Sequence, residues 1–146
     1  MAITQAIANS FKKQLLEGDA NFKNSGGDVF KLALYTSSAT LNSSTTAFTT
    51  SGEVGNTGTY ASGGDPLAGQ NTSIASGVAI VDFADLSFTG VTLTARGALI
   101  YNTSSAVTNA AVAVLDFGAD KTATSGTFTI QFPAFTTAAA ILRISG

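Results

Sequence analysis

The chain has 146 residues without Cys or His, a formal net charge of −2, and charged residues at only 11% of its positions. This length is typical of a single domain. The missing Cys and His exclude disulfides, thiolate sites and histidine-based acid–base or metal chemistry. Because only seven Lys and Arg residues are spread over the whole length, a nucleic-acid partner is not expected.

The missing charge is replaced by Thr, Ser, Asn and Gly, while the apolar fraction stays at an ordinary 45%. Typical soluble domains carry about 25% charged residues. Interface cores are depleted in charge, so this composition fits a subunit that assembles with other proteins. It fits equally well a β-protein whose exposed strand positions favour Thr.

No apolar run reaches the length of a membrane span, so no membrane partner is expected. The N-terminus does not follow the order of a secretory signal, because the Lys12-Lys13 pair comes after the apolar residues instead of before them. We therefore expect a protein that is made in the cytoplasm and used without export.

The N-terminal residues follow a helical pattern. Apolar side chains recur at four-residue spacing at Ile3, Ile7, Phe11 and Leu15. This spacing predicts one helix from about Thr4 to Glu17, ended by Gly18. Its apolar stripe could pack on the protein's own sheet or lie on a neighbouring subunit. We divide the chain into an N-terminal helix or arm at 1–18 and a single β-sandwich domain at 19–146.

Apolar or alternating runs that end in Gly, Asn, Asp, Ser or Pro predict strands in the remaining chain. The first is Phe30–Tyr35. Those of the C-terminal half are 77–83, 91–101, 110–117, 127–132 and 139–144. Together they predict an all-β fold, an antiparallel, jelly-roll-like β-sandwich of about eight strands with one N-terminal α-helix.

The segment 36–73 departs from this pattern, because it is rich in Ser, Thr and Gly and has only isolated apolar residues. A structureless loop of this length is unusual inside a domain, so we expect short strands near 47–50 and 53–60 and a turn at 63–66. Phe48 and Tyr60 are lone aromatic residues in this excursion. They either anchor a partner or cover one end of the sheet core.

Two arginines, Arg96 and Arg143, lie within predicted strands. A charged residue in a strand is usually solvated on the outer face of the sheet. The sharper alternative is an interface arginine, because the guanidinium group forms forked bonds with carboxylates.

Carboxylates are the only reactive side chains left, because the chain has no nucleophile elbow and no phosphate-binding loop. Asp82 and Asp116 each follow small or β-branched residues and precede Phe. If these strand ends meet, the two residues could form an acid–base pair, or bind Ca²⁺ together with Asp85 and Asp120. Asp at a strand end is first of all a turn former. We therefore expect no catalytic residue, no metal, no cofactor and no enzymatic activity.

Loose strand-and-turn patterns over most of the chain carry a resemblance to known proteins. In the first half they are LALYTSSATL at 32–41, FTTSGEV at 48–54 and YASGG at 60–64. In the second half they are ALIYN at 98–102, VLDFG at 114–118, TFTIQFP at 127–133 and ILRI at 141–144. The chain thereby resembles small virion structural proteins of tailed bacteriophages, most closely head decoration or cement proteins.

This resemblance implies a β-sandwich or jelly roll that binds the outside of the phage head and ties neighbouring capsomers together. The implied partners are the major capsid protein and copies of the protein itself, as a dimer or trimer. No nucleic acid, membrane or small-molecule substrate is implied. The protein would be found on the head surface of the virion after synthesis in the host cytoplasm.

We expect the partner contacts on the helix stripe and on the excursion, at Ile3, Ile7, Phe11, Leu15, Phe48 and Tyr60. The alternative function is a tail, fibre or adsorption module that binds host-surface carbohydrate. Exposed aromatic rings beside Asp and Asn would favour that alternative. A hydrolase that acts through Asp82 and Asp116 is the third possibility.

Overall fold

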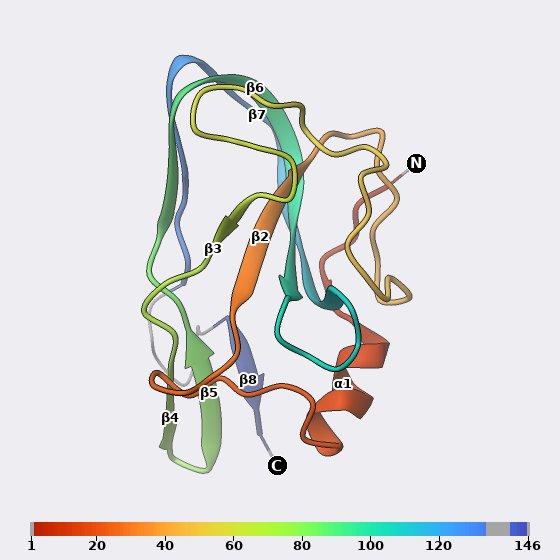
Figure 1. The fold of residues 1–146 in the computed structure, drawn as a ribbon, viewed down its shortest axis with the longest axis vertical. Coiled ribbons are helices and arrows are strands. Elements are labelled where there is room, and N and C mark those ends of the chain that lie inside the picture. Colours follow the sequence, from red (N-terminus) through yellow and green to blue (C-terminus); the bar gives the residue numbers. More distant parts are fainter. Residues whose placement is uncertain (1, 134–140, 146) are drawn as a thin grey trace.

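The protein is described by a computed structural model that covers residues 2–133 and 141–145. Antiparallel strands dominate it, and one short helix, α1 (Asn9–Leu16), lies near the N-terminus (Figure 1). The strands form a five-stranded and a three-stranded sheet. The predicted antiparallel all-β sandwich with one N-terminal helix is confirmed.

The larger sheet contains β1 (Ala6–Ile7), β2 (Phe30–Tyr35), β3 (Asp65–Pro66), β6 (Leu86–Asn102) and β7 (Ala110–Ile130). Its strand order is β1-β7-β6-β2-β3. β6 and β7 form one long hairpin, and β2 pairs with the C-terminal part of β6. The end of β2 is buried on both faces, which explains why its sequence is continuously apolar from Leu32 to Tyr35.

The smaller sheet contains β4 (Asn71–Ala75), β5 (Val78–Asp82) and β8 (Leu142–Ile144), in the order β4-β5-β8. β4 and β5 are joined by a two-residue turn in which Ser76 and Gly77 have φ of 51° and 76°. Positive φ at both positions gives the turn type that matches the twist of a hairpin. Figure 1 shows this sheet at the same end of the molecule as α1.

The helix is shorter than predicted. Ile3 forms an isolated bridge with Leu41, and Ile7 belongs to β1 and pairs with Ala113. The start of the stripe is therefore extended chain, held by backbone bonds that the side-chain spacing does not reveal. The predicted stop is present: the N–H of Gly18 donates to Leu15 O, and the next N–H donates to Gln14 O. These two bonds form a Schellman motif.

The second half has longer strands than predicted. The predicted strands at 110–117 and 127–132 are parts of one strand, β7, because pairing with β6 carries the chain through the Gly- and Thr-rich stretch between them. Shifts in the β6–β7 register absorb the irregular positions. The last predicted strand is reduced to β8, and positions 139–140 of it lie outside the described residues.

The excursion at 36–73 contains less regular structure than predicted. The expected strands at 47–50 and 53–60 are only isolated bridges, from Ala47 to Ala110, from Glu53 to Tyr35, and from Thr57 to Tyr60. The expected turn at 63–66 instead leads into β3, which pairs with β2. The excursion runs back along the free edge of β2, where the N–H of Val54 donates to Leu34 O over 2.9 Å.

Glycine makes this close approach possible. At Gly64 φ is +73°, and a Cβ there would overlap the carbonyl oxygen of Leu32. At Gly55, in the same excursion, a Cβ would meet nothing within 4 Å. The two positions therefore separate the combined effect of positive φ and steric overlap from the general effect of adding a methyl group.

We expect Gly64→Ala to lower the free energy of unfolding by about 2 to 4 kcal/mol, because the strained φ and the overlap with the β2 backbone add together. Gly55→Ala should stay within about 0.5 kcal/mol of the wild type. Urea denaturation of both variants checks this. Equal stability of the two variants would show that the excursion is not packed on β2.

Candidate functional site

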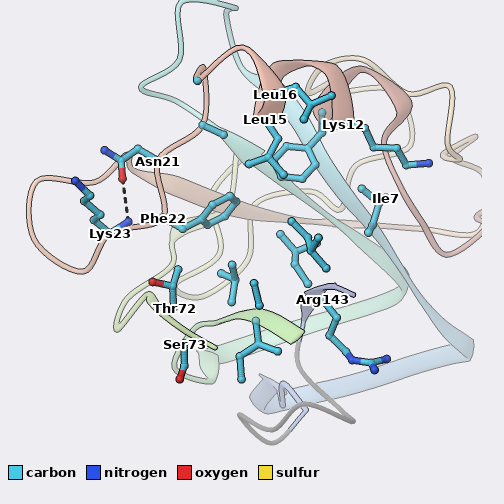
Figure 2. A pocket seen from close by; sticks show the side chains of 18 of the residues that line it. Ile7, Lys12, Leu15, Leu16, Asn21, Phe22, Lys23, Thr72, Ser73 and Arg143 are labelled. Carbon is cyan, nitrogen blue, oxygen red and sulfur yellow. Dashed lines mark hydrogen bonds between the residues drawn. The ribbon is translucent and has the colours of Figure 1, made fainter. Parts of the chain in front are cut away.

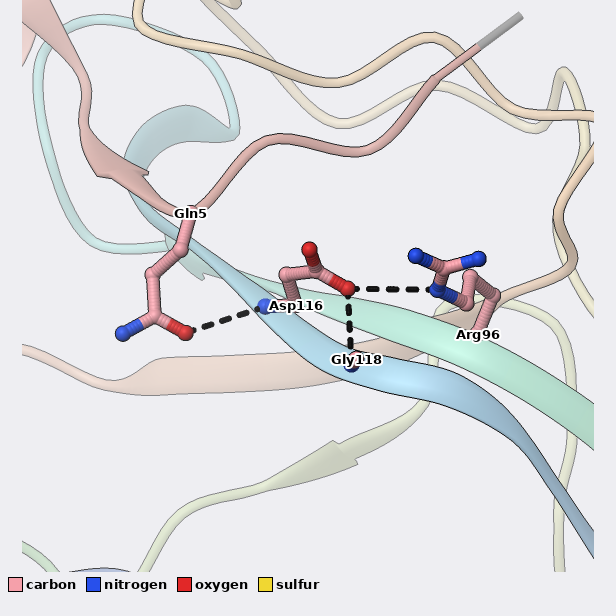
Figure 3. Close-up of polar contacts among 4 residues, drawn as sticks. All are labelled: Gln5, Arg96, Asp116 and Gly118. Atoms are coloured by element: carbon pink, nitrogen blue, oxygen red, sulfur yellow. Dashed lines mark hydrogen bonds and ion pairs between the residues drawn. The ribbon is translucent and has the colours of Figure 1, made fainter.

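The carboxylate cluster that the sequence allowed as an alternative does not assemble. Asp116 lies on β7 beside Arg96, with 3.2 Å between its Oδ1 and the Arg96 Nε (Figure 3). The same Oδ1 accepts a bond from the N–H of Gly118, and the N–H of Asp116 donates to the side chain of Gln5. The Gly118 N–H and then Arg96 lower the pKa of Asp116. Arg96 is thus paired within its own chain and half exposed.

Asp82 has different surroundings, because it ends β5 in the other sheet. Burial, and then the charge of Asp85, raise the pKa of Asp82. Asp85 itself accepts a bond from the N–H of Phe132 over 2.9 Å, and Asp120 is exposed. Within the described part of the chain, no three Asp or Glu residues are grouped closely enough to hold a metal ion. The hypothetical calcium site is therefore not formed.

The polar cluster around Glu53 is structural. Glu53 accepts bonds from the Tyr60 hydroxyl, the N–H of Gly63 and the Ser62 hydroxyl, over 2.8, 2.6 and 2.8 Å. The Tyr60 oxygen in turn accepts a bond from the N–H of Leu34. This carboxylate therefore ties the excursion to β2, and its oxygens already have partners.

The six predicted contact residues belong to the core or pack against it. Ile3, Phe11 and Tyr60 are buried, while Ile7, Leu15 and Phe48 are partly buried against the same cluster. The ring centroid of Phe48 lies 4.9 Å from that of Tyr101, and the ring of Tyr60 lies 4.9 Å from that of Phe88. Both excursion rings therefore cover the sheet core, which was the alternative to a role as partner anchors.

An open apolar groove lies between α1 and the smaller sheet and has a volume of about 820 Å³ (Figure 2). The Schellman motif turns the chain at the end of α1, and the connector then brings Phe22 to the groove. The apolar side chains of the helix side are Phe11, Leu15 and Leu16. Those of the sheet side are Ala79, Ile80, Val81, Leu142 and Ile144.

The groove exposes apolar side chains to solvent. Leu16 is 89% exposed at the end of α1, and Ile144 is 59% exposed on β8. Scattered single apolar residues are ordinary on a surface, but exposed apolar residues that share one concave surface indicate a binding site. This groove is the candidate functional site.

The groove has cations but no carboxylate side chains. Lys12, Lys23 and Arg143 line it, which is three of the seven Lys and Arg residues of the chain. None of the nine Asp and Glu residues lines it. In Figure 2 these three residues come from α1, the connector and β8, so the cations surround the apolar floor. A complementary partner would present aliphatic side chains with carboxylates beside them.

Three of the predicted contact residues, Ile7, Phe11 and Leu15, line this groove, and the sequence pattern missed the rest of it. Leu16 directly follows the last residue of the predicted stripe. A large apolar side chain on the polar side of the helix was the sequence signal that could have indicated this site.

Of the strands that line the groove, β5 and β8 were predicted at 77–83 and 139–144, whereas β4, which contributes Thr72 and Ser73, was not predicted. The closeness of these strands to α1 was not predicted either, because no local pattern encodes it. The described Phe and Tyr residues are buried or partly buried, so none of them presents an exposed ring.

No protein-family model, curated protein or solved structure matches this chain. Among the described residues, no helix is long and apolar enough to cross a bilayer. The groove and the exposed strands are therefore the features from which a function can be inferred.

The three tyrosines provide a test of the polar cluster around the excursion. Burial raises the pKa of Tyr101 to about 12, and burial likewise raises the pKa values of Tyr35 and Tyr60. An unfolded tyrosine loses its proton near pH 10. Above that pH the unfolded state binds fewer protons than the folded state, so the free energy of unfolding must fall.

We expect tyrosinate absorbance to appear together with the loss of far-ultraviolet circular dichroism as the pH rises above about 10. Tyr60→Phe should lower the free energy of unfolding at pH 7 by about 1 to 3 kcal/mol, because the N–H of Leu34 and Glu53 lose a partner. It should also make the alkaline loss of stability less steep. Ionisation of all three tyrosines near pH 10 in the folded protein would contradict the burial described here.

Proposed function

We propose that the protein is a virion structural protein that decorates the outside of a phage head and binds the capsid shell through the groove. The observation that carries this proposal is the open apolar groove with three cations and no carboxylate side chain. The family resemblance supplies the partner, and the groove supplies a surface with which that partner could be bound.

The described residues favour binding over catalysis. Two carboxylates that could have served in catalysis already have partners: Glu53 accepts three hydrogen bonds, and Asp116 is paired with Arg96. A catalytic carboxylate must instead reach a substrate. The groove offers apolar contact area and positive charge, which suit recognition of another protein.

The shell segment that we propose as occupant carries aliphatic side chains flanked by Asp or Glu. Its aliphatic groups would cover Leu16 and Ile144, and its carboxylates would lie near Lys12 and Lys23. Each such contact can be weak on its own. Binding becomes strong on an assembled head, because a decoration oligomer that contacts several capsomers holds them through linked sites.

The carbohydrate-binding alternative finds less support. Sugar recognition uses exposed aromatic rings, and the Phe and Tyr residues that the structure describes are buried or partly buried. The head-decoration proposal needs no exposed ring, since the large exposed apolar side chains of the groove, Leu16 and Ile144, are aliphatic.

We expect Leu16→Gln to weaken binding to isolated heads about tenfold or more, because burial of a leucine side chain contributes roughly 1.5 to 3 kcal/mol. The stability of the free protein should stay almost unchanged, since Leu16 is 89% exposed and Gln has a similar helix propensity. Cosedimentation with heads measures binding, and the rupture temperature of the decorated heads measures the stabilisation.

Val107→Gln is the matched control, because Val107 is 40% exposed and lies outside the groove. It should bind heads as the wild type does. Higher salt should weaken wild-type binding, since the cations of the groove are screened. A wild-type protein that ignores heads, or a Leu16→Gln variant that binds them normally, would overturn the proposal.

A further inference from the structure

Strands at the edge of a sheet invite pairing with another chain, and natural proteins usually block them with charges, Pro, bulges or short length. In the described structure, β1 and β3 have two residues each, and β3 includes Pro66. β8 has three residues and includes Arg143. These three edges are therefore poor templates for a further strand.

β7 is also protected where it forms an edge. Beyond its two-residue pairing with β1 it has a neighbour only on the β6 side among the described strands. This part carries Asp116, Asp120 and Lys121, and its register with β6 shifts at several points. Charges and irregular register both oppose the addition of a strand.

β4 lacks every one of these protections. It has five residues, all exposed, in unbroken register with β5. It contains no Pro, and no charged residue occurs from Leu67 to Val81. Ile74 is 73% exposed in the middle of this uncharged segment. Figure 1 shows β4 as the outermost strand of its sheet, on the side away from β8.

The turn fixes which backbone groups face outward. In a hairpin closed by a two-residue turn, the residues that flank the turn bond to each other, and the bonded pairs then alternate along the strands. Ala75 and Ser73 therefore bond to β5, while Thr72 and Ile74 point their N–H and C=O groups away from it. The N–H of Thr72 donates to the side chain of Asn71 over 3.0 Å, as an amide without a partner strand can do.

We propose that β4 pairs antiparallel with β4 of a second copy of this chain. The edge is self-complementary, because Thr72 of one copy would lie opposite Ile74 of the other, and the outward groups of both would bond in pairs. The absence of charge from Leu67 to Val81 lets two copies approach without like-charge repulsion. The two three-stranded sheets would join into one sheet of six strands.

This inference does not depend on binding to a phage head. β4 contributes Thr72 and Ser73 to the groove, but Ile74 does not line it and Leu16 lies on α1, so each surface can still be changed by itself. Failure of head binding would leave self-pairing intact, and failure of self-pairing would leave the groove proposal intact.

The test is sedimentation velocity of the full chain from about 1 µM to about 1 mM, the range of weak specific association. The wild type should associate with rising concentration. Ile74→Lys and Ile74→Glu should each weaken association several-fold, because each new charge would lie opposite Thr72 and diagonally across from the like charge of the other copy, about 7 to 8 Å away. An equal mixture of the two variants should restore association, since Lys and Glu on neighbouring strands attract.

Two further measurements keep the test specific. Val107→Lys places the same charge on another exposed apolar position and should associate as the wild type does. The amide of Ile74 should exchange with solvent more slowly as the wild-type concentration rises. A wild type that stays monomeric throughout, an Ile74→Lys variant that associates normally, or a mixture that fails to recover would each overturn the proposal.

Discussion

The free edge of β2 is the constraint on which the rest of the structure depends. β2 is buried on both faces near its end, so its outward N–H and C=O groups must find partners inside the protein. The excursion supplies them. Leu34 donates to the Tyr60 hydroxyl and accepts from Val54, and the N–H of Leu67 donates to Phe30 O. A segment that looks like a loose loop is therefore an ordered border of the sheet.

The unusual composition follows from this border. A chain that lies directly along another backbone needs positions without side chains, and Gly64 meets that need beside Leu32. It also needs short polar groups that can satisfy turns without bringing charge into the core, as Thr36 does by donating to Gly52 O. Glu53 is the exception, and three donors compensate its charge.

Two surfaces at the smaller sheet, the β4 edge and the groove, remain uncovered by the described residues. The excursion seals the edge of β2, but no described segment seals β4 or fills the groove beside α1. The groove combines exposed Leu16 with cations and fits an acidic, aliphatic partner. The β4 edge has no charged residue and no apolar groove, and its outward backbone groups fit another strand. One small sheet could thus serve a contact to a larger shell and a contact to a second copy.

The sequence by itself determined the all-β class, the strand at Phe30–Tyr35 and the stop at Gly18, because each depends on neighbouring residues and on the allowed backbone angles of glycine. For Phe48 and Tyr60 it left two alternatives, a position over the sheet core or a role as partner anchors. Only the tertiary structure decided that β7 runs unbroken and that Ile7 is extended. It alone brought α1, β5 and β8 together into a groove and left β4 unprotected, because strand partners far apart in the chain leave no local pattern.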